Sequence, residues 1–356
     1  MNQDVDSMEA ALFALKVWKY KEGELVTLMM HVGDQLGLYT QMRGRGPITA
    51  TMLADQTGLD ERWLLEWLRG QAAAELLTRS ADDAYELTDT AAEVLANEES
   101  SLLFAAGAMA PPPDSMTVPR LLESFRTGVG PTWDDQGSDR AATVDRNLGV
   151  WTRLALVDQV VPALDGVQEK LQNGIDVVEV GCGAGAAMLT LAAAFGQSRF
   201  VGIDPSVLAI QLADEKLAAT GLTNVSFQAD YGEHFESDTN FEFVLTFDCL
   251  HHMPFPELTM QNIRNHIAED ATWLVKDIRC SPDFHENRKN PVHALMYGYS
   301  LTACLPSGLS EPDGLGLGTL GMHPSLLQQM SEKAGFTRFK IHDFEDPANL
   351  YYEIRP

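Results

Sequence analysis

Residues 177–188 read VVEVGCGAGAAM, a short apolar run that turns at once into glycines. An apolar strand that breaks into a Gly-rich turn and then a helix is typical of a nucleotide-binding loop. From residue 175 onward, β-branched and aromatic segments alternate with helical ones, which predicts a doubly wound α/β sheet. Its strands are expected at 175–180, 199–204, 225–230, 241–248 and 271–278, followed by an antiparallel pair at 336–344 and 350–356.

The glycine loop fits two nucleotide ligands. As Gly181-x-Gly183-x-x-Ala186 it matches the dinucleotide fingerprint, and as Glu179-x-Gly181-x-Gly183-x-Gly185 it matches a loop that binds S-adenosylmethionine. A dinucleotide would bring a pyrophosphate to this turn, where the Glu179 carboxylate would repel it. The aminoacyl end of S-adenosylmethionine carries an ammonium that Glu179 can hold, so this acid favours the second ligand.

Acids after the next two strands point the same way. Asp204 lies 19 positions after Gly185, where a carboxylate accepts hydrogen bonds from ribose hydroxyls. Asp230 can accept one from the adenine amine, with Ala229 and Tyr231 beside it. Together with residues after the fourth strand, the predicted cofactor-binding set is Glu179, Gly181, Gly183, Gly185, Asp204, Pro205, Ala229, Asp230, Tyr231, Phe247 and Asp248.

These motifs resemble class I S-adenosylmethionine-dependent methyltransferases, with VVEVGCGAG, VGID and FQAD as the matching segments. The resemblance implies a Rossmann-like domain with a seven-stranded sheet and an antiparallel closing strand. It also implies S-adenosyl-L-methionine as methyl donor, and it does not supply an acceptor. Further stretches resemble a bacterial subfamily with an N-terminal winged-helix domain, at 46–77, 247–253, 302–321 and 335–356.

The N-terminal segments predict that winged-helix domain over residues 1–100, starting with a helix over 5–40. Segment 49–77 reads as helix–turn–helix with Gly58 at the turn and Asp60 capping the second helix. Segment 76–88 reads as two short strands around an acidic turn. The second helix is expected to bury a stripe formed by Trp63, Leu64, Trp67 and Leu68.

A helical connector is predicted over 101–172 and the methyltransferase domain over 173–356, with an insertion at about 281–325 that can cover the acceptor. Residues 142–172 predict a single helix with three large apolar side chains on one side, Leu148, Trp151 and Leu154.

The charge balance excludes several partners. Lys and Arg total 25 against 51 Asp and Glu, a formal net charge of −26, which repels nucleic-acid phosphates and anionic membrane surfaces. We therefore expect the winged helix to dimerise or to cover the substrate rather than bind DNA. The apolar helix over 5–40 favours a homodimer.

Compartment and membrane signals favour a cytoplasmic protein. The acidic N-terminus lacks the basic region of a signal peptide. The longest apolar stretch, 176–196, contains Glu179 and three glycines, so it predicts a strand, loop and helix rather than a membrane span. The cysteines form no Cys-x-x-Cys pair, which indicates reduced thiols rather than disulfides or zinc, at Cys182, Cys249, Cys280 and Cys304.

The candidate general bases lie in FDCLHHM, residues 247–253, because an imidazole titrates near neutral pH. His251 matches the family's recurrent Leu-His, whereas His252 stands where subfamily members often carry an acid. Neighbouring side chains on a turn diverge, so at most one is expected to face the acceptor. In the 281–325 insertion, the candidate acceptor-binding residues are His293, Tyr297 and Cys304.

No metal is predicted, since the insertion's histidines, His285, His293 and His323, are 8 and 30 positions apart. The favoured function is methyl transfer to oxygen, sulfur or nitrogen of a small molecule, with a thiol, sulfide or hydroxylated metabolite as plausible acceptors. The alternatives are a cofactor-sensing winged-helix transcriptional regulator and a dinucleotide-dependent oxidoreductase.

Overall fold

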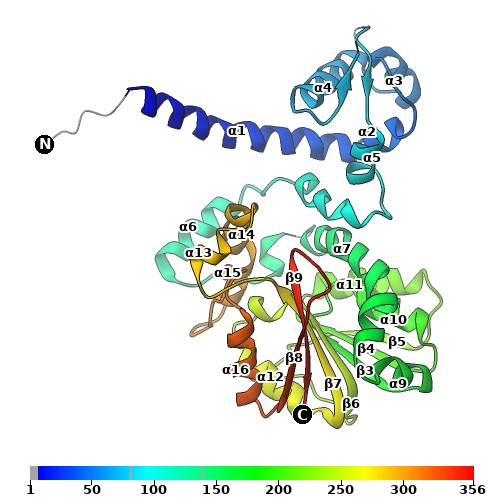
Figure 1. Cartoon of the computed structure of the whole chain (residues 1–356), viewed down its shortest axis with the longest axis vertical. Helices are drawn as coiled ribbons and strands as arrows, with labels where there is room; N and C mark the ends of the chain where they lie inside the picture. The colour runs from blue at the N-terminus through cyan, green and yellow to red at the C-terminus, as the bar shows by residue number, and fades with distance from the viewer. Residues whose placement is uncertain (1–6, 81, 138) are drawn as a thin grey trace, which may run out of the picture. The chain divides into compact units, whose positions relative to one another are not determined.

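The computed structural model describes residues 7–80, 82–137 and 139–356, which divide into two compact units (Figure 1). The first comprises the residues up to Pro112 together with Arg146–Val150. The second comprises Pro113–Asp145 and Trp151–Pro356. The predicted connector, 101–172, is thus shared between the two units.

The first unit is a winged helix-turn-helix preceded by a long helix. Thr49 caps its third helix, Gly58 ends that helix at φ 72°, and Asp60 caps the next by accepting from the backbone of Arg62 and Trp63, as the sequence predicted. The two short strands pair antiparallel to form the wing. The elements are α1 (Ser7–Gln35), α2 (Leu38–Met42), α3 (Ala50–Thr57), α4 (Glu61–Ala73), β1 (Thr78–Arg79), β2 (Tyr85–Glu86), α5 (Asp89–Leu95) and η1 (Ser101–Met109).

Two expectations for this unit were wrong. The helix expected over 5–40 ends at Gln35, because Gly37 adopts φ 67° and starts a separate helix; residues 5 and 6 lie outside the described residues. Trp63 is not part of the buried stripe: it is 80% exposed, whereas Leu64, Trp67 and Leu68 are buried. Trp63 shares the first turn of α4 with Leu64, and only Leu64 reaches the core from that turn.

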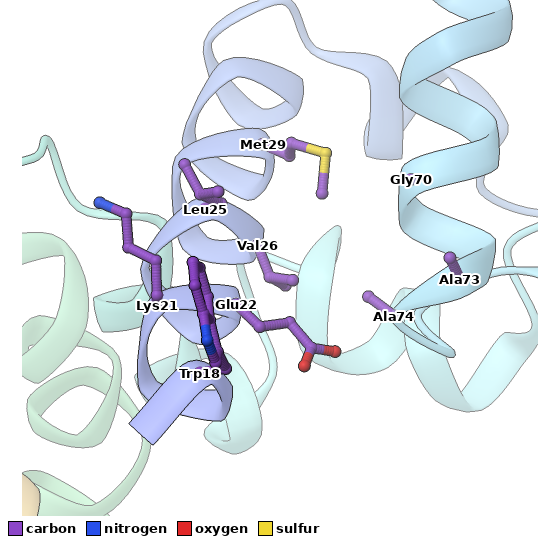
Figure 2. A pocket seen from close by; sticks show the side chains of 9 residues that line it. All are labelled: Trp18, Lys21, Glu22, Leu25, Val26, Met29, Gly70, Ala73 and Ala74. Carbon is purple, nitrogen blue, oxygen red and sulfur yellow. The ribbon is translucent and has the colours of Figure 1, made fainter. Parts of the chain in front are cut away.

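A groove runs between α1 and α4, with a volume of about 440 Å³ (Figure 2). Its α4 wall is made of small residues, which leave the space open, and its α1 wall carries larger apolar side chains. The lining residues are Trp18, Lys21, Glu22, Leu25, Val26, Met29, Gly70, Ala73 and Ala74. On α1, large apolar side chains are also exposed at Met8, Leu12, Phe13, Leu15, Val17, Trp18 and Tyr20.

The single helix expected over 142–172 is broken in the structure. Pro162, which lacks a backbone N–H, lies at the start of α8, and the chain then turns at Gly166 with φ 71°. Leu154 is 45% exposed, and the side chain of Leu148 lies outside the described residues. The elements of this region are α6 (Thr117–Thr127), η2 (Asp134–Gln136), α7 (Arg140–Trp151), the π-helix η3 (Thr152–Val160), α8 (Val161–Ala163) and α9 (Val167–Asn173).

A seven-stranded sheet forms the centre of the second unit, in the order β5-β4-β3-β6-β7-β9-β8. The first five strands are parallel and β9 runs antiparallel between β7 and β8, which confirms the predicted closing pair. The strands are β3 (Asp176–Val180), β4 (Arg199–Asp204), β5 (Val225–Ala229), β6 (Phe241–Phe247), β7 (Ile267–Ile278), β8 (Arg338–His342) and β9 (Asn349–Arg355).

Each face of the sheet has its own apolar core, because successive side chains of a strand point to opposite faces. Val177 packs with Met188 and Leu191 of α10 on one face, while Val178 packs with Met260 and Leu327 on the other. Figure 1 shows α9 and α10 on one side of the sheet and α12 and α16 on the other. These and the remaining helices are α10 (Ala186–Ala194), α11 (Val207–Ala218), η4 (Leu250–His252), α12 (Pro256–Asn265), α13 (Phe284–Asn287), α14 (His293–Tyr299), the π-helix η5 (Ser300–Cys304), α15 (Leu305–Gly308) and α16 (Pro324–Lys333).

Among the helices that the structure describes, none combines the length and the apolar character that crossing a membrane requires.

Candidate functional site

The glycine loop connects β3 to α10, and its three glycines differ in their surroundings. All have positive φ: 78° at Gly181, 52° at Gly183 and 74° at Gly185. A Cβ at Gly181 would lie 2.6 Å from the sulfur of Cys249, and one at Gly185 would lie 2.5 Å from the ring of Phe227. A Cβ at Gly183 would meet nothing within 4 Å. Packing therefore requires two of the glycines, whereas the third borders open space.

Glu179, in β3 just before this loop, is a buried carboxylate for which the described residues provide no ion pair. It is 3% exposed, and its Oε2 atom has no hydrogen-bond partner among the described residues. Burial, together with the nearby Asp204 carboxylate, raises the pKa of Glu179 well above its ordinary value, although Lys276 and Lys216 act in the opposite direction. A cationic ligand would satisfy this carboxylate.

Asp204 ends β4 beside the same loop. Its Oδ2 accepts a hydrogen bond from the backbone N–H of Gly183 at 2.8 Å, and its Oδ1 accepts one from that of Ser206 at 2.9 Å. Burial raises the pKa of Asp204 to about 6, against the effect of these two hydrogen bonds. Each oxygen keeps a second lone pair for a ligand hydroxyl. The Ser206 hydroxyl donates to Asp134, and Pro205 is exposed.

The end of β5 lies beside Asp204. Ala229 is paired with Asp204 across the two strands, and the Asp230 N–H donates to the Asp204 carbonyl at 3.2 Å. The Asp230 carboxylate accepts from the backbone of Tyr231 at 2.8 Å, and the Tyr231 side chain is 54% exposed. The sheet thus brings three predicted cofactor-binding residues to one edge beside the Gly loop.

At the end of β6, the Asp248 carboxylate is already paired. Its Oδ2 accepts from the buried ammonium of Lys276, and its Oδ1 accepts from the Asn349 amide at 2.5 Å. The Lys276 ammonium also lies 4.7 Å from the centre of the Trp151 ring, which contacts Phe247 edge-on at 5.7 Å. The sequence analysis did not predict these contacts of Lys276. A lysine within the mostly apolar strand 271–278 could have indicated a buried ion pair.

His251 and Asp277 form a buried pair. His251 is 2% exposed and Asp277 1%, and their Nδ1 and Oδ1 atoms lie 2.7 Å apart. Asp277 also accepts from the backbone N–H of Ile278 at 2.7 Å, which fixes the carboxylate. Burial alone would lower the pKa of His251, but Asp277 and Cys304 outweigh it and hold that pKa well above its usual value of 6.5.

His252 lies against the His251 ring, so the prediction that the two side chains diverge was wrong. The ring centres are 4.3 Å apart, and His252 also packs edge-on against Trp133 at 5.0 Å. Asp277 fixes the His251 ring and Trp133 borders the His252 ring. These contacts bring the two rings together, although neighbouring side chains on a turn usually point in different directions. Burial, with help from His251 and Arg140, lowers the pKa of His252 well below its usual value, and its Nδ1 has no partner among the described residues.

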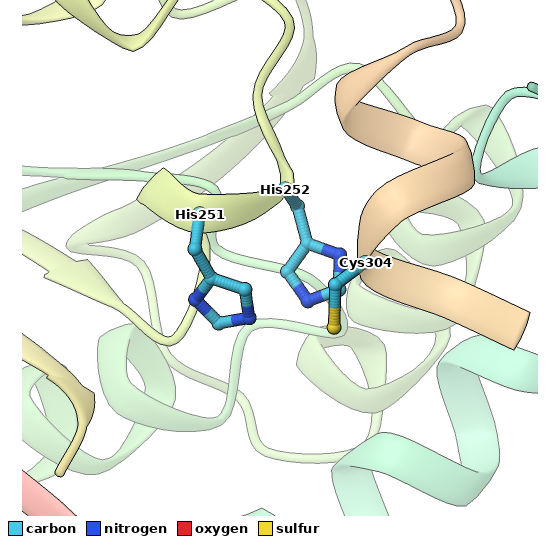
Figure 3. A group of neighbouring side chains, drawn as sticks. All are labelled: His251, His252 and Cys304. Atoms are coloured by element: carbon cyan, nitrogen blue, oxygen red, sulfur yellow. The ribbon is translucent and has the colours of Figure 1, made fainter. Parts of the chain in front are cut away.

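Cys304 joins the two histidines, whereas the other insertion residues lie elsewhere. Ligand atoms of His251, His252 and Cys304 all lie within 4.8 Å of one another (Figure 3), and the Cys304 sulfur also contacts the Thr319 hydroxyl at 2.9 Å. The rings of His293 and Tyr297 instead contact each other at 5.0 Å and both contact Phe284. The absence of a metal stays a prediction.

Comparisons with known proteins match both parts of the chain. A family model described as a methyltransferase domain matches residues 171–306, and one described as an Rv2258c-like winged HTH domain matches residues 24–97. Over 110 residues, the chain is 29% identical to (S)-coclaurine N-methyltransferase of Thalictrum flavum subsp. glaucum, covering 31% of this chain and 30% of that protein. The chain thus spans about a third of the length of the curated relatives it matches.

Solved structures match along the whole chain. The mitomycin 7-O-methyltransferase MmcR has a TM-score of 0.70 at 20% identity, covering 98% of this chain and 99% of that chain. Human N-acetylserotonin methyltransferase, solved in complex with S-adenosylmethionine, has a TM-score of 0.67 at 15% identity, covering 100% and 99%. These likenesses confirm the fold. Residues 171–306 thus match the family model of a methyltransferase domain, residues 24–97 match that of a winged helix-turn-helix domain, and the chain shares the fold of these solved methyltransferases.

Proposed function

We propose that this protein transfers a methyl group from S-adenosyl-L-methionine to oxygen, nitrogen or sulfur of a small molecule. The observation that carries the proposal is the edge formed by Glu179, Gly183 and Asp204. A buried carboxylate with one oxygen unpartnered among the described residues, an open glycine and a carboxylate with free lone pairs adjoin one turn. A pyrophosphate would be repelled there, whereas an ammonium would be bound.

The residues of this edge fit the donor group by group. Glu179 would hold the amino group, and Asp204 would accept from the ribose hydroxyls. Ala229, Asp230 and Tyr231 lie at the adjoining strand end, where the adenine would bind. Phe247 would contribute an apolar wall, while Asp248 serves indirectly, because Lys276 and Asn349 already occupy its oxygens.

The bound donor supplies an electrophilic methyl group with a neutral leaving group, so positioning the acceptor in line is the main task of the protein. For a hydroxylated acceptor we assign the general base to His251. When Nδ1 donates to Asp277, the neutral ring presents Nε2 as a proton acceptor. The acceptor proton would move to that Nε2 atom as the acceptor attacks. His252, kept neutral by burial, would line the acceptor site beside it.

The names of similar proteins support a small acceptor without identifying it. The relatives include N-methyltransferases, and the similar structures include O-methyltransferases. A thiol or sulfide acceptor would need little help from a base because thiols ionise near neutral pH.

Calorimetry separates this proposal from a dinucleotide oxidoreductase. We expect S-adenosylhomocysteine, the product, to bind and NADH not to bind; binding of NADH alone would refute the proposal. Radiolabelled donor, incubated with a panel of thiols, phenols, amines and carboxylic acids, then identifies the methylated atom.

A DNA-binding regulator is disfavoured by charge on the winged helix. Helix α4 carries Glu61 and Glu66 on exposed positions, and Arg69 and Arg79 are both paired with Asp83 in the wing. These cations are therefore not free for phosphates. Tight, salt-sensitive binding of duplex DNA in a gel-shift titration would overturn this assignment.

We further propose that the protein is located in the cytoplasm, which its four free thiols favour. We also propose that it forms a homodimer in which α1 of a second copy enters the groove between α1 and α4. Helix α1 has 29 residues and is about 43 Å long, at about 1.5 Å per residue. Its exposed apolar side chains and the small-residue wall of α4 are complementary surfaces on one chain, as a two-fold interface requires. Light scattering at the mass of a monomer would contradict the dimer.

A further inference from the structure

Arg140, the first residue of α7, packs on Trp133, which in turn contacts His252, and it has no counter-ion among the described residues. Its Nη2 atom donates to the Thr302 carbonyl at a long 3.4 Å, and its guanidinium carbon lies 5.3 Å from the centre of the Trp133 ring. Its Nε atom is shielded from solvent and has no hydrogen-bond partner in the described parts of the chain. Within those same parts, no carboxylate forms an ion pair with Arg140.

Other arginines of this acidic chain are placed differently. Arg146 is paired with Asp34 at 2.7 Å and with Glu98 at 2.6 Å. Arg153 and Arg288, for which the described residues provide no ion pair, are exposed, so water solvates their charge. Arg140 is less exposed than these two, its Nε atom is shielded from water, and no carboxylate of the described residues pairs with it. With 51 acidic residues in the chain, a missing partner at this position is informative.

A cation shielded from water without a counter-ion costs stability, so natural proteins pair such charges or use them. The position of Arg140 indicates that it binds a ligand. Trp133 lies between Arg140 and His252, contacting the first through its face and the second edge-on. The cation is therefore one ring away from the proposed acceptor site.

Gln136 of η2 supplies an independent observation in the same place. Its Nε2 atom donates to the Ser307 hydroxyl at 2.8 Å and to the Ala303 carbonyl at 3.2 Å, which fixes the amide. Its Oε1 atom is buried with no partner in the part of the chain that the structure describes. The Gln136 oxygen and the Arg140 guanidinium could therefore both bind groups of a ligand.

We propose that Arg140 binds a carboxylate of the methyl acceptor, so that the substrates are small, partly aromatic carboxylic acids with a separate hydroxyl, thiol or amine. A planar guanidinium and a carboxylate form two parallel hydrogen bonds, and Trp133 offers the carbon skeleton an apolar ring. Arg140 binds the carboxylate, and the second group of the substrate receives the methyl group. The methyl–sulfur bond breaks, a bond from the methyl to the second group forms, and the proton of that group passes to His251. This inference rests on the proposed methyl transfer and narrows its substrate class.

The test uses benzoate and benzyl alcohol as matched probes, titrated calorimetrically into protein saturated with S-adenosylhomocysteine. We expect wild-type protein to bind benzoate at least 10-fold more tightly than benzyl alcohol, and Arg140→Met to lose this preference. Arg140→Lys, which keeps the charge without the planar fork, should retain part of it. The exposed Arg153→Met serves as control and should retain it in full. Equal binding of the two probes by wild type, or an unchanged preference in Arg140→Met, overturns the inference.

The melting temperature of the protein without ligands separates binding from a structural role. Because Arg140→Met removes an uncompensated charge, it should melt at the wild-type temperature or above it. A lower melting temperature together with a wild-type preference for benzoate would show that Arg140 only supports the Thr302 segment. If S-adenosylhomocysteine itself fails to bind wild type, the proposed function fails; if it binds and benzoate has no advantage, only the present inference fails.

Discussion

Replacing Glu179 by glutamine removes a charge from β3 while nearly preserving the volume of the side chain. In the free protein the carboxylate is 3% exposed and one oxygen has no partner among the described residues. In the donor complex we expect the same carboxylate to face an ammonium. The substitution should therefore have opposite effects on the free and the bound states.

For the free protein, the sign follows from the raised pKa of Glu179. A carboxyl whose pKa is higher in the folded than in the unfolded state makes no difference below the ordinary value of 4.5, and it destabilises progressively as the pH rises above that value. An unpartnered buried acceptor costs about 1–3 kcal/mol, and more when charged. Since 1 kcal/mol shifts the melting temperature of a domain of this size by about 2–4 °C, Glu179→Gln should melt at least a few degrees higher at pH 7.5. The gain should shrink toward pH 4.5.

For the complex, removing one partner of a buried charge pair costs about 2–5 kcal/mol. This corresponds to a roughly 30- to 4000-fold weaker Kd for S-adenosylhomocysteine. Calorimetry at pH 7.5 and thermal melts of the same preparations measure both effects. Glu242→Gln, in the neighbouring strand β6, is the matched control and should change neither. A Glu179→Gln protein that melts lower and binds with wild-type affinity would refute the reasoning.

Four further predictions concern the remaining proposals. Asp204→Ala should weaken S-adenosylhomocysteine binding by about 1–3 kcal/mol in calorimetry, because ribose hydroxyls lose their acceptor; unchanged affinity would remove the ribose assignment. With a hydroxylated acceptor, the wild-type rate should rise with pH through a value above 6.5, since Asp277 and Cys304 hold the His251 pKa up, and His251→Ala should lose about 10²–10⁴-fold. Asp277→Asn should move this rise in rate to lower pH, because burial then lowers the pKa of His251. A rise at an unchanged pH would exclude His251 as the titrating group. Leu15→Asp should give monomers in light scattering while Lys16→Glu stays dimeric, and a dimeric Leu15→Asp would place the interface elsewhere.

Much of the fold could be predicted because its determinants are local. The seven strands follow from β-branched runs, and the glycine loop follows from backbone positions with positive φ. The errors arose where tertiary packing overrides pattern. Trp63 shares the helical spacing of Trp67, but only the latter reaches the core.

The cofactor edge was more visible in the sequence than the acceptor site, for a physical reason. Glu179, Asp204 and Asp230 lie at or just after the carboxyl ends of three neighbouring parallel strands, so sheet topology alone brings them together. Trp133 and Arg140 come from a segment whose composition indicates only a connector, and nothing in the local pattern of strand 271–278 shows that Asp277 pairs with His251. Contacts between distant segments decide these positions, and a single sequence carries no direct record of such contacts.

The most direct test of the account is a crystal structure of the protein with S-adenosylhomocysteine. We predict its amino group against Glu179, its ribose hydroxyls on Asp204 and its adenine beside Asp230. Density for the ligand at another place, or a Glu179 carboxylate that contacts no part of it, would show that this edge of the sheet does not bind the methyl donor.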